Sequence, residues 1–112
     1  MLEVALQRPP ARRAQAANQA ALIALTKAMA REWAPWGIRV NAISPGPFLS
    51  EMMLGAERLS EGFLDRSSAA TMQKRVAALD EIKGAIVYFA GEASSYVTGE
   101  DHVVSGGMLR SG

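Results

Sequence analysis

Cysteine is absent from the 112 residues, which excludes disulfides, thiolate metal sites and thiol nucleophiles. The net charge is only +1, so no strong field attracts nucleic acid or an anionic membrane. No apolar run approaches the roughly 20 residues that span a bilayer. We therefore expect neither nucleic acid nor a membrane as a partner. A chain without cysteine is also typical of the cytoplasm, which is the expected location.

The first part of the chain predicts a helix followed by a strand. Over residues 14–33, apolar side chains recur at helical spacing on one stripe, at Leu22, Leu25, Met29 and Trp33. Pro35 ends this helix, because proline cannot donate to the helix ladder. Residues 38–43 then have the pattern of a short buried strand, which the sequence Ser44-Pro45-Gly46-Pro47 ends.

The second part predicts further helices and one more strand. Residues 48–59 are expected as an irregular or short helical connection, and residues 102–104 as a strand. Helices are expected from Ser60, as N-cap, to about Met72 and over residues 81–90, with Asp80 as N-cap and Gly91 as C-cap.

The order helix-strand-helix-helix-strand predicts two parallel strands joined by a right-handed crossover. Residues 1–13, with two prolines and little periodicity, are expected as an irregular N-terminal tail, and residues 14–112 as one partial α/β domain. Two strands make a thin sheet, and such a sheet normally has further strands beside it. The chain is therefore expected either to pair with another copy or to be a piece of something larger.

Three motifs stand in one order at characteristic spacings: Gly37-Ile38-Arg39-Val40-Asn41, Ser44-Pro45-Gly46-Pro47 and Ser94-Ser95-Tyr96-Val97-Thr98-Gly99. Together they resemble the C-terminal segment of the short-chain dehydrogenases/reductases. The resemblance runs nearly continuously from Ala20 to Gly107. It implies the C-terminal part of a Rossmann-like, doubly wound parallel sheet and, for the family, hydride transfer with NAD or NADP.

The residues that perform this chemistry in the family are not found here. In the family a tyrosine exchanges the proton, and a lysine four residues later lowers its pKa and holds the nicotinamide ribose. The matching positions are Gln15 and Gln19, whose amides do not titrate, so no catalytic residue is expected. The glycine-rich phosphate loop G-x-x-x-G-x-G is also missing, so neither NAD nor NADP is expected to bind tightly.

The resemblance leaves one remnant of a cofactor site. It implies that Pro45, Gly46, Phe48 and Ser50 face the nicotinamide carboxamide, while retention of this loop for packing is the alternative. No metal site is expected, since ordinary surface charge accounts for the scattered acidic residues and His102. Asp101 and His102 are neighbours on a strand and therefore point to opposite faces.

The leading prediction is a truncated short-chain dehydrogenase/reductase-like protein that lacks hydride transfer on its own. Two alternatives remain open: a non-catalytic, self-associating interaction module, and an enzyme of unrelated chemistry on the remnant scaffold. The expected partner is a second copy, giving a homodimer or higher homo-oligomer, because the stripe on residues 14–33 and the open edge of residues 38–43 invite pairing. A missing N-terminal half is the other partner that the resemblance implies.

Overall fold

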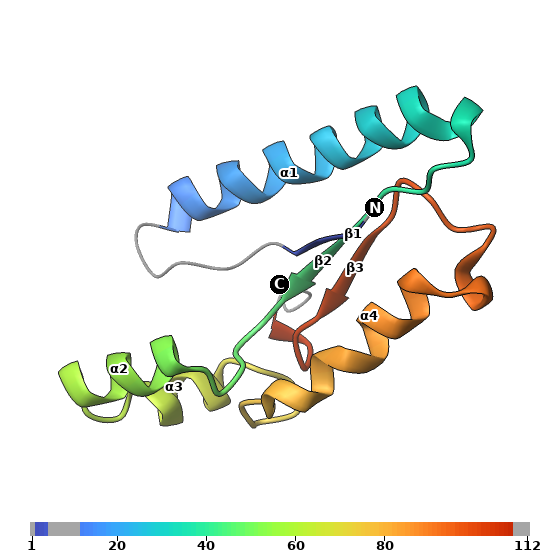
Figure 1. Cartoon of the computed structure of the whole chain (residues 1–112). Coiled ribbons are helices and arrows are strands. Elements are labelled where there is room, and N and C mark those ends of the chain that lie inside the picture. The colour runs from blue at the N-terminus through green and yellow to red at the C-terminus, as the bar shows by residue number, and fades with distance from the viewer. Residues whose placement is uncertain (1, 5–11, 109–112) are drawn as a thin grey trace.

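The computed structural model describes residues 2–4 and 12–108, with side chains from residue 16 onward. Strand β1 (Leu2–Val4), helix α1 (Arg12–Trp33) and the 3-10 turn η1 (Ala34–Trp36) come first, followed by strand β2 (Asn41–Pro45). The remaining elements are α2 (Glu51–Leu59), α3 (Phe63–Ala69), η2 (Leu79–Ile82), α4 (Lys83–Ala90), η3 (Glu92–Ser94) and β3 (Asp101–Val104) (Figure 1).

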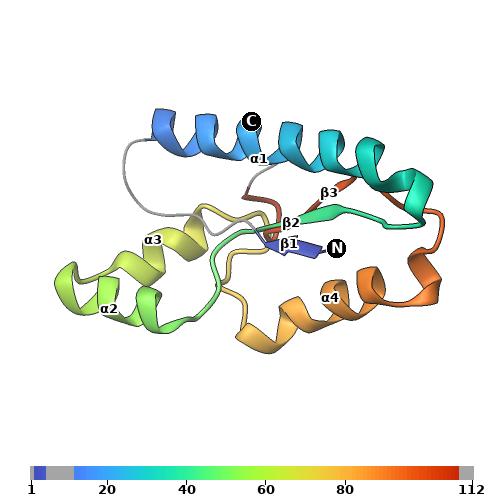
Figure 2. The ribbon, with the colours of Figure 1, turned by 45° about the horizontal axis from the view of Figure 1, so that its top comes forward.

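The described strands form one parallel sheet in the order β1-β2-β3. Helix α1 covers one face of the sheet and α4 covers the other (Figure 2). The predicted α/β class with parallel strands is therefore confirmed. The connection from β1 to β2 runs through α1, and the connection from β2 to β3 runs through α4. Both move along the sheet in the same direction, but α1 and α4 lie on opposite faces. The two crossovers therefore have opposite hands. The β2–β3 crossover is the left-handed one, and the prediction of a right-handed connection there is wrong.

The sheet differs from the predicted pair of strands at its edge. Residues 2–4 were expected in an irregular tail, but they pair with β2 in the register Leu2↔Asn41. The rest of that tail up to residue 11, together with residue 1, lies outside the described residues. Since β2 is paired on both sides, the open edge expected at residues 38–43 is occupied, and the edges of the described sheet are those of β1 and β3.

Strand β2 is also displaced toward the carboxyl end of the predicted strand. Residues before Asn41 bond to the loop that precedes β3: the Val40 N–H donates to the Thr98 hydroxyl at 3.0 Å, and the Val40 carbonyl accepts the Gly99 N–H at 2.7 Å. Pro45 is tolerated because it is the last residue of the strand. Gly46 then continues the ladder, its N–H donating to the Val104 carbonyl at 2.8 Å.

Helix α1 confirms the predicted helix, but its buried face is turned relative to the predicted stripe. Thr26 and Ala30 are buried, whereas Leu25 is 50% exposed. Leu22, Met29 and Trp33 are half-buried beside them. Leu25 therefore lies off the face that packs on the sheet and remains available to a partner.

The caps of the shorter helices differ from those expected. Ser60 ends α2, and α3 begins after Gly62, whose φ of 84° suits glycine. The Glu57 carboxylate caps α3 by accepting the N–H groups of Leu64 at 2.8 Å and Gly62 at 3.1 Å. Glu81, not Asp80, accepts the N–H of Ala78 at 2.7 Å before α4. Gly91 is the C-cap of α4, as predicted.

The core is small for the size of the chain. Among the described side chains, the buried apolar residues are Ala30, Val40, Ala42, Ile43, Phe48 and Phe89. The accessible surface is 7568 Å², whereas a compact monomer of this mass exposes about 6,000 Å². Exposed apolar side chains such as Trp36 and Leu59, at 72% and 92%, contribute to this surface. Within the described residues, no helix is both long enough and apolar enough to cross a bilayer.

Candidate functional site

A cleft of about 130 Å³ lies beyond the carboxyl ends of β2 and β3. Three segments line it: the loop after β2, the loop after β3, and residues 73–81, with side chains or backbone of Pro47, Phe48, Gln73, Arg75, Ala77, Glu81, Val104, Ser105 and Gly106. In open α/β sheets this is where ligands bind. The volume is below the roughly 300–1,000 Å³ of typical ligand pockets, so the cleft can hold only part of a dinucleotide.

The predicted cofactor residues Pro45 and Gly46 lie at the end of β2, next to this cleft. Pro45 is buried within the strand. A Cβ on Gly46 would lie 2.6 Å from the Ser105 Cα and 2.7 Å from its Cβ. Real side chains never approach backbone so closely, so glycine is needed here for the two loops to pack together.

The other two predicted residues, Phe48 and Ser50, also have packing roles. Phe48 is buried, lines the cleft and forms a parallel bridge with Ala77. The Ser50 hydroxyl accepts the Met53 N–H at 3.3 Å and so caps α2. Of these four residues, Phe48 alone lines the cleft. Pro45 and Gly46 precede it at the end of β2, and Ser50 caps α2. Their role toward a cofactor stays a prediction.

Gln15 and Gln19 stand one turn apart in the first half of α1. The Gln19 side chain is half-buried, and the Gln15 side chain lies outside the described ones. The two tyrosines of the chain lie on other elements than α1, Tyr88 on α4 and Tyr96 in the loop before β3. Tyr88 packs edge-on against Phe89 with ring centroids 5.2 Å apart, and Tyr96 is fully exposed.

The motifs that carry the family resemblance hold one another in place. The Arg39 guanidinium donates to the carbonyls of Ser94 at 2.9 Å and Phe89 at 3.0 Å, and so caps the end of α4. Asn41 donates to the Val97 carbonyl and accepts the Glu100 N–H, both at 3.1 Å. The first and third motifs are therefore one structural unit that joins β2 to the loop before β3.

Asp101 and His102 do point to opposite faces of the sheet, as predicted. Asp101 accepts a hydrogen bond from the Ser44 hydroxyl at 2.6 Å. The His102 ring packs edge-on against Phe89 of α4, at 5.4 Å. Across the described part of the chain, no three His, Cys, Asp or Glu side chains gather in a way that could hold a metal ion.

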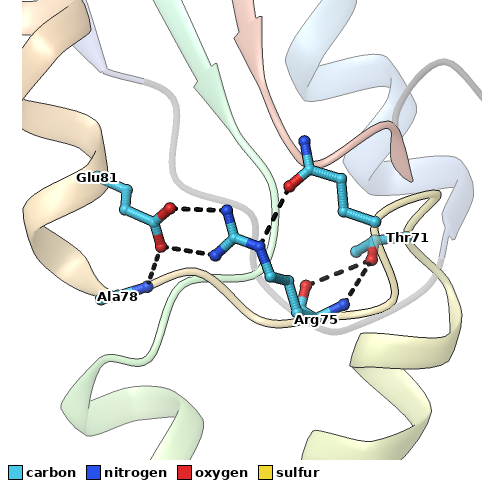
Figure 3. Close-up of polar contacts among 5 residues, drawn as sticks. Thr71, Arg75, Ala78 and Glu81 are labelled. Atoms are coloured by element: carbon cyan, nitrogen blue, oxygen red, sulfur yellow. Dashed lines mark hydrogen bonds and ion pairs between the residues drawn. The ribbon is translucent and has the colours of Figure 1, made fainter.

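One wall of the cleft is a feature that sequence reasoning missed. Arg75 donates through both terminal nitrogens to the Glu81 carboxylate, at 2.7 and 2.8 Å, and through Nε to Gln73 at 3.2 Å (Figure 3). The hydrogen bonds from Arg75 and from the Ala78 N–H lower the pKa of Glu81 to about 2. Since its charge is paired, Arg75 is a poor anchor for an anionic ligand. No periodic pattern signals a pair six residues apart across a loop.

Comparisons with known proteins agree on one family. The sequence model of a family described as enoyl-(acyl carrier protein) reductase matches residues 4–109. Sorbose reductase of Schizosaccharomyces pombe is 42% identical over 91 residues, which cover 81% of this chain and 34% of that reductase.

Solved structures show the same likeness. Gluconate 5-dehydrogenase of Burkholderia cenocepacia, in complex with NADP and tartrate, is 31% identical with a TM-score of 0.84, over 99% of this chain and 45% of that one. A short-chain type dehydrogenase/reductase of Mycobacterium marinum is 34% identical with a TM-score of 0.79, over 96% of this chain and 43% of that one. The chain therefore spans less than half the length of these relatives.

Proposed function

Because the chain belongs to the short-chain dehydrogenase/reductase family, we propose that it is a structural portion of that oxidoreductase fold and does not transfer hydride on its own. The observation that carries this proposal is the pair Gln15 and Gln19 on α1, at the positions of the family's tyrosine and lysine. An amide can neither relay a proton nor lower the pKa of a phenol. Loss of such general acid-base catalysis alone costs about 10² to 10⁴-fold in rate.

The residues present do not fit a complete dinucleotide. The cleft of about 130 Å³ is small, and its arginine is already paired with Glu81. Within the described residues, no glycine-rich turn leads from a strand directly into a helix, as a pyrophosphate site requires. Pro45, Gly46, Phe48 and Ser50 are proposed as the remnant of a nicotinamide-facing loop, and binding of NAD or NADP is expected to be no tighter than millimolar.

The second candidate is a non-catalytic, self-associating module of the cytoplasm. It is favoured by the exposed apolar surface of α1, where Leu25 is 50% exposed. The same surface would equally accept the segment of the family fold that this chain does not span. Solution mass separates these two partners.

The test is a search for steady oxidation or reduction of NAD(H) and NADP(H) by the purified chain over a panel of sugars, sugar acids and alcohols. No turnover is expected. Turnover that is lost on Ser50→Ala would overturn the proposal. The double variant Gln15→Tyr/Gln19→Lys serves as a sharper control, because it restores the acid-base pair without a pyrophosphate site. We expect it to stay inactive and to bind NAD(H) no better in calorimetry.

A further inference from the structure

Residues 71–77 form a strap that joins the loops at the carboxyl ends of two strands. The Gln73 N–H donates to the Gly106 carbonyl after β3, at 3.0 Å. The Ala77 N–H donates to the Pro47 carbonyl at 3.0 Å, and the Ala77 carbonyl accepts the Leu49 N–H at 2.8 Å. The strap therefore touches both loops, and its own residues supply the third wall of the cleft.

The strap is folded tightly on itself at its first turn. The Thr71 side chain is buried, and its hydroxyl accepts the Arg75 N–H at 3.1 Å (Figure 3). Lys74 has a φ of 58°, a conformation that is uncommon for residues other than glycine. Such a turn is retained only where surrounding contacts fix it.

Helix α3 is bonded only to the first half of the strap. The Thr71 hydroxyl donates to the Ser68 carbonyl at 2.9 Å, and the Lys74 ammonium group donates to the Ala69 carbonyl at 2.8 Å. Helices α2 and α3 contain no buried residue between 51 and 69, and they pack mainly on each other. Figure 1 shows them projecting from the end of the sheet. The strong contacts that fix the other end of the strap are the two parallel hydrogen bonds between Arg75 and Glu81, which tie it to the start of α4.

We propose that Arg75 and Glu81 are positioning residues: their bidentate pair holds the strap across the carboxyl ends of β2 and β3 and thereby sets the shape of the cleft. Any ligand of this cleft meets walls whose spacing the pair determines. The proposal does not depend on whether that ligand is a nicotinamide cofactor.

The test is amide hydrogen exchange on the full chain with Arg75→Gln, Glu81→Gln and the double variant. Exchange at Leu49, Gln73 and Ala77 is expected to become about tenfold faster, the effect of losing a charge-assisted hydrogen bond on a local opening. Because the pair acts as a unit, the double variant should exchange no faster than either single one. The Gly99 amide, bonded to Val40 at the opposite end of the sheet, can open locally without breaking the pair, so its exchange should not change.

The matched control is Asp80→Asn, which removes the neighbouring exposed ion pair between Asp80 and Lys83 at 3.1 Å. It should leave the strap amides unchanged. Unchanged exchange at Leu49 and Ala77 in the Gln variants, or an equal rise at Gly99, would overturn the proposal. If the Gln variants do not fold, Arg75→Lys decides: it keeps the charge but loses the bidentate geometry, and the strap amides should still exchange faster than in Asp80→Asn.

Discussion

Gly46 lies where the loops after β2 and β3 come closest, so a single added methyl group tests that contact. Gly46→Ala would place a Cβ 2.6 Å from the Ser105 Cα, and backbone must move to relieve it. We expect a loss of about 1–3 kcal/mol in the free energy of unfolding, measured by urea denaturation. Gly55→Ala is the control, because nothing lies within 4 Å of its added methyl group. It should be neutral or should stabilise α2.

The lowered pKa of Glu81 predicts how the free energy of unfolding changes at acid pH. Its pKa in the folded protein is lowered from 4.5 to about 2, first by Arg75 and then by the Ala78 N–H. Its contribution is therefore fully present above the ordinary carboxyl pKa and is lost as the pH falls from about 4.5 toward 2. Glu81→Gln should make the thermal unfolding midpoint depend less on pH across that window. Glu57, whose pKa is lowered by the N–H groups of Leu64 and Gly62, should leave a residual slope. An unchanged slope in Glu81→Gln would contradict this assignment.

At the scale of elements, the long helix was predictable and the short segments were not. Residues 14–33 carry enough apolar periodicity to predict α1, but Leu25 was assigned to the wrong face because Thr26 and Ala30 are the buried residues. β1 spans three residues, too few for any period to be visible. The shift of β2 depends on bonds to Thr98 and Gly99, more than 50 residues away in sequence.

One part of the candidate site was also predictable from the sequence and another part was not. The loop from Pro45 to Ser50 was found through its resemblance to a family motif, and the structure places Pro47 and Phe48 of this loop in the wall of the cleft. The strap was missed, because its defining pair joins Arg75 to Glu81 across an irregular loop. The motif around Arg39 was correctly singled out, but its chemistry is that of a helix cap, which only the fold reveals.

Arg39 connects the start of β2 to the end of α4, so its substitution tests how these two elements are joined. Arg39→Lys removes the planar guanidinium that reaches the carbonyls of Phe89 and Ser94 together. Hydrogen bonds from a charged donor contribute about 1.5–3 kcal/mol each, so a loss of that order in unfolding free energy is expected. Arg58→Lys, on the exposed surface of α2, should change stability by less than about 0.5 kcal/mol. Equal effects of the two substitutions would refute the capping role.

For the whole molecule, the accessible surface of 7568 Å² exceeds that of a compact monomer of the same mass by roughly a quarter. The excess is of the same order as the total area of a standard protein–protein interface, about 1,600 Å². The chain also spans less than half the length of its structural relatives. Burial of this surface against a partner would supply apolar contact that the small core does not provide.

We expect that partner to be a second copy, with α1 at the interface. Leu25 is half-exposed at the flank of the buried face of α1, near exposed alanines that permit close helix packing. If about 800 Å² per partner is buried and somewhat over half is apolar, the gross gain is roughly 20 kcal/mol against association costs of about 4–15 kcal/mol. Leu25→Glu should therefore dissociate the dimer and leave a poorly folded monomer, as seen by light scattering and circular dichroism. Leu59→Glu, at a more exposed leucine on α2, should keep the mass of a dimer. A wild-type chain that is a compact, cooperatively melting monomer at micromolar concentration would contradict self-association and favour the missing family segment as the partner.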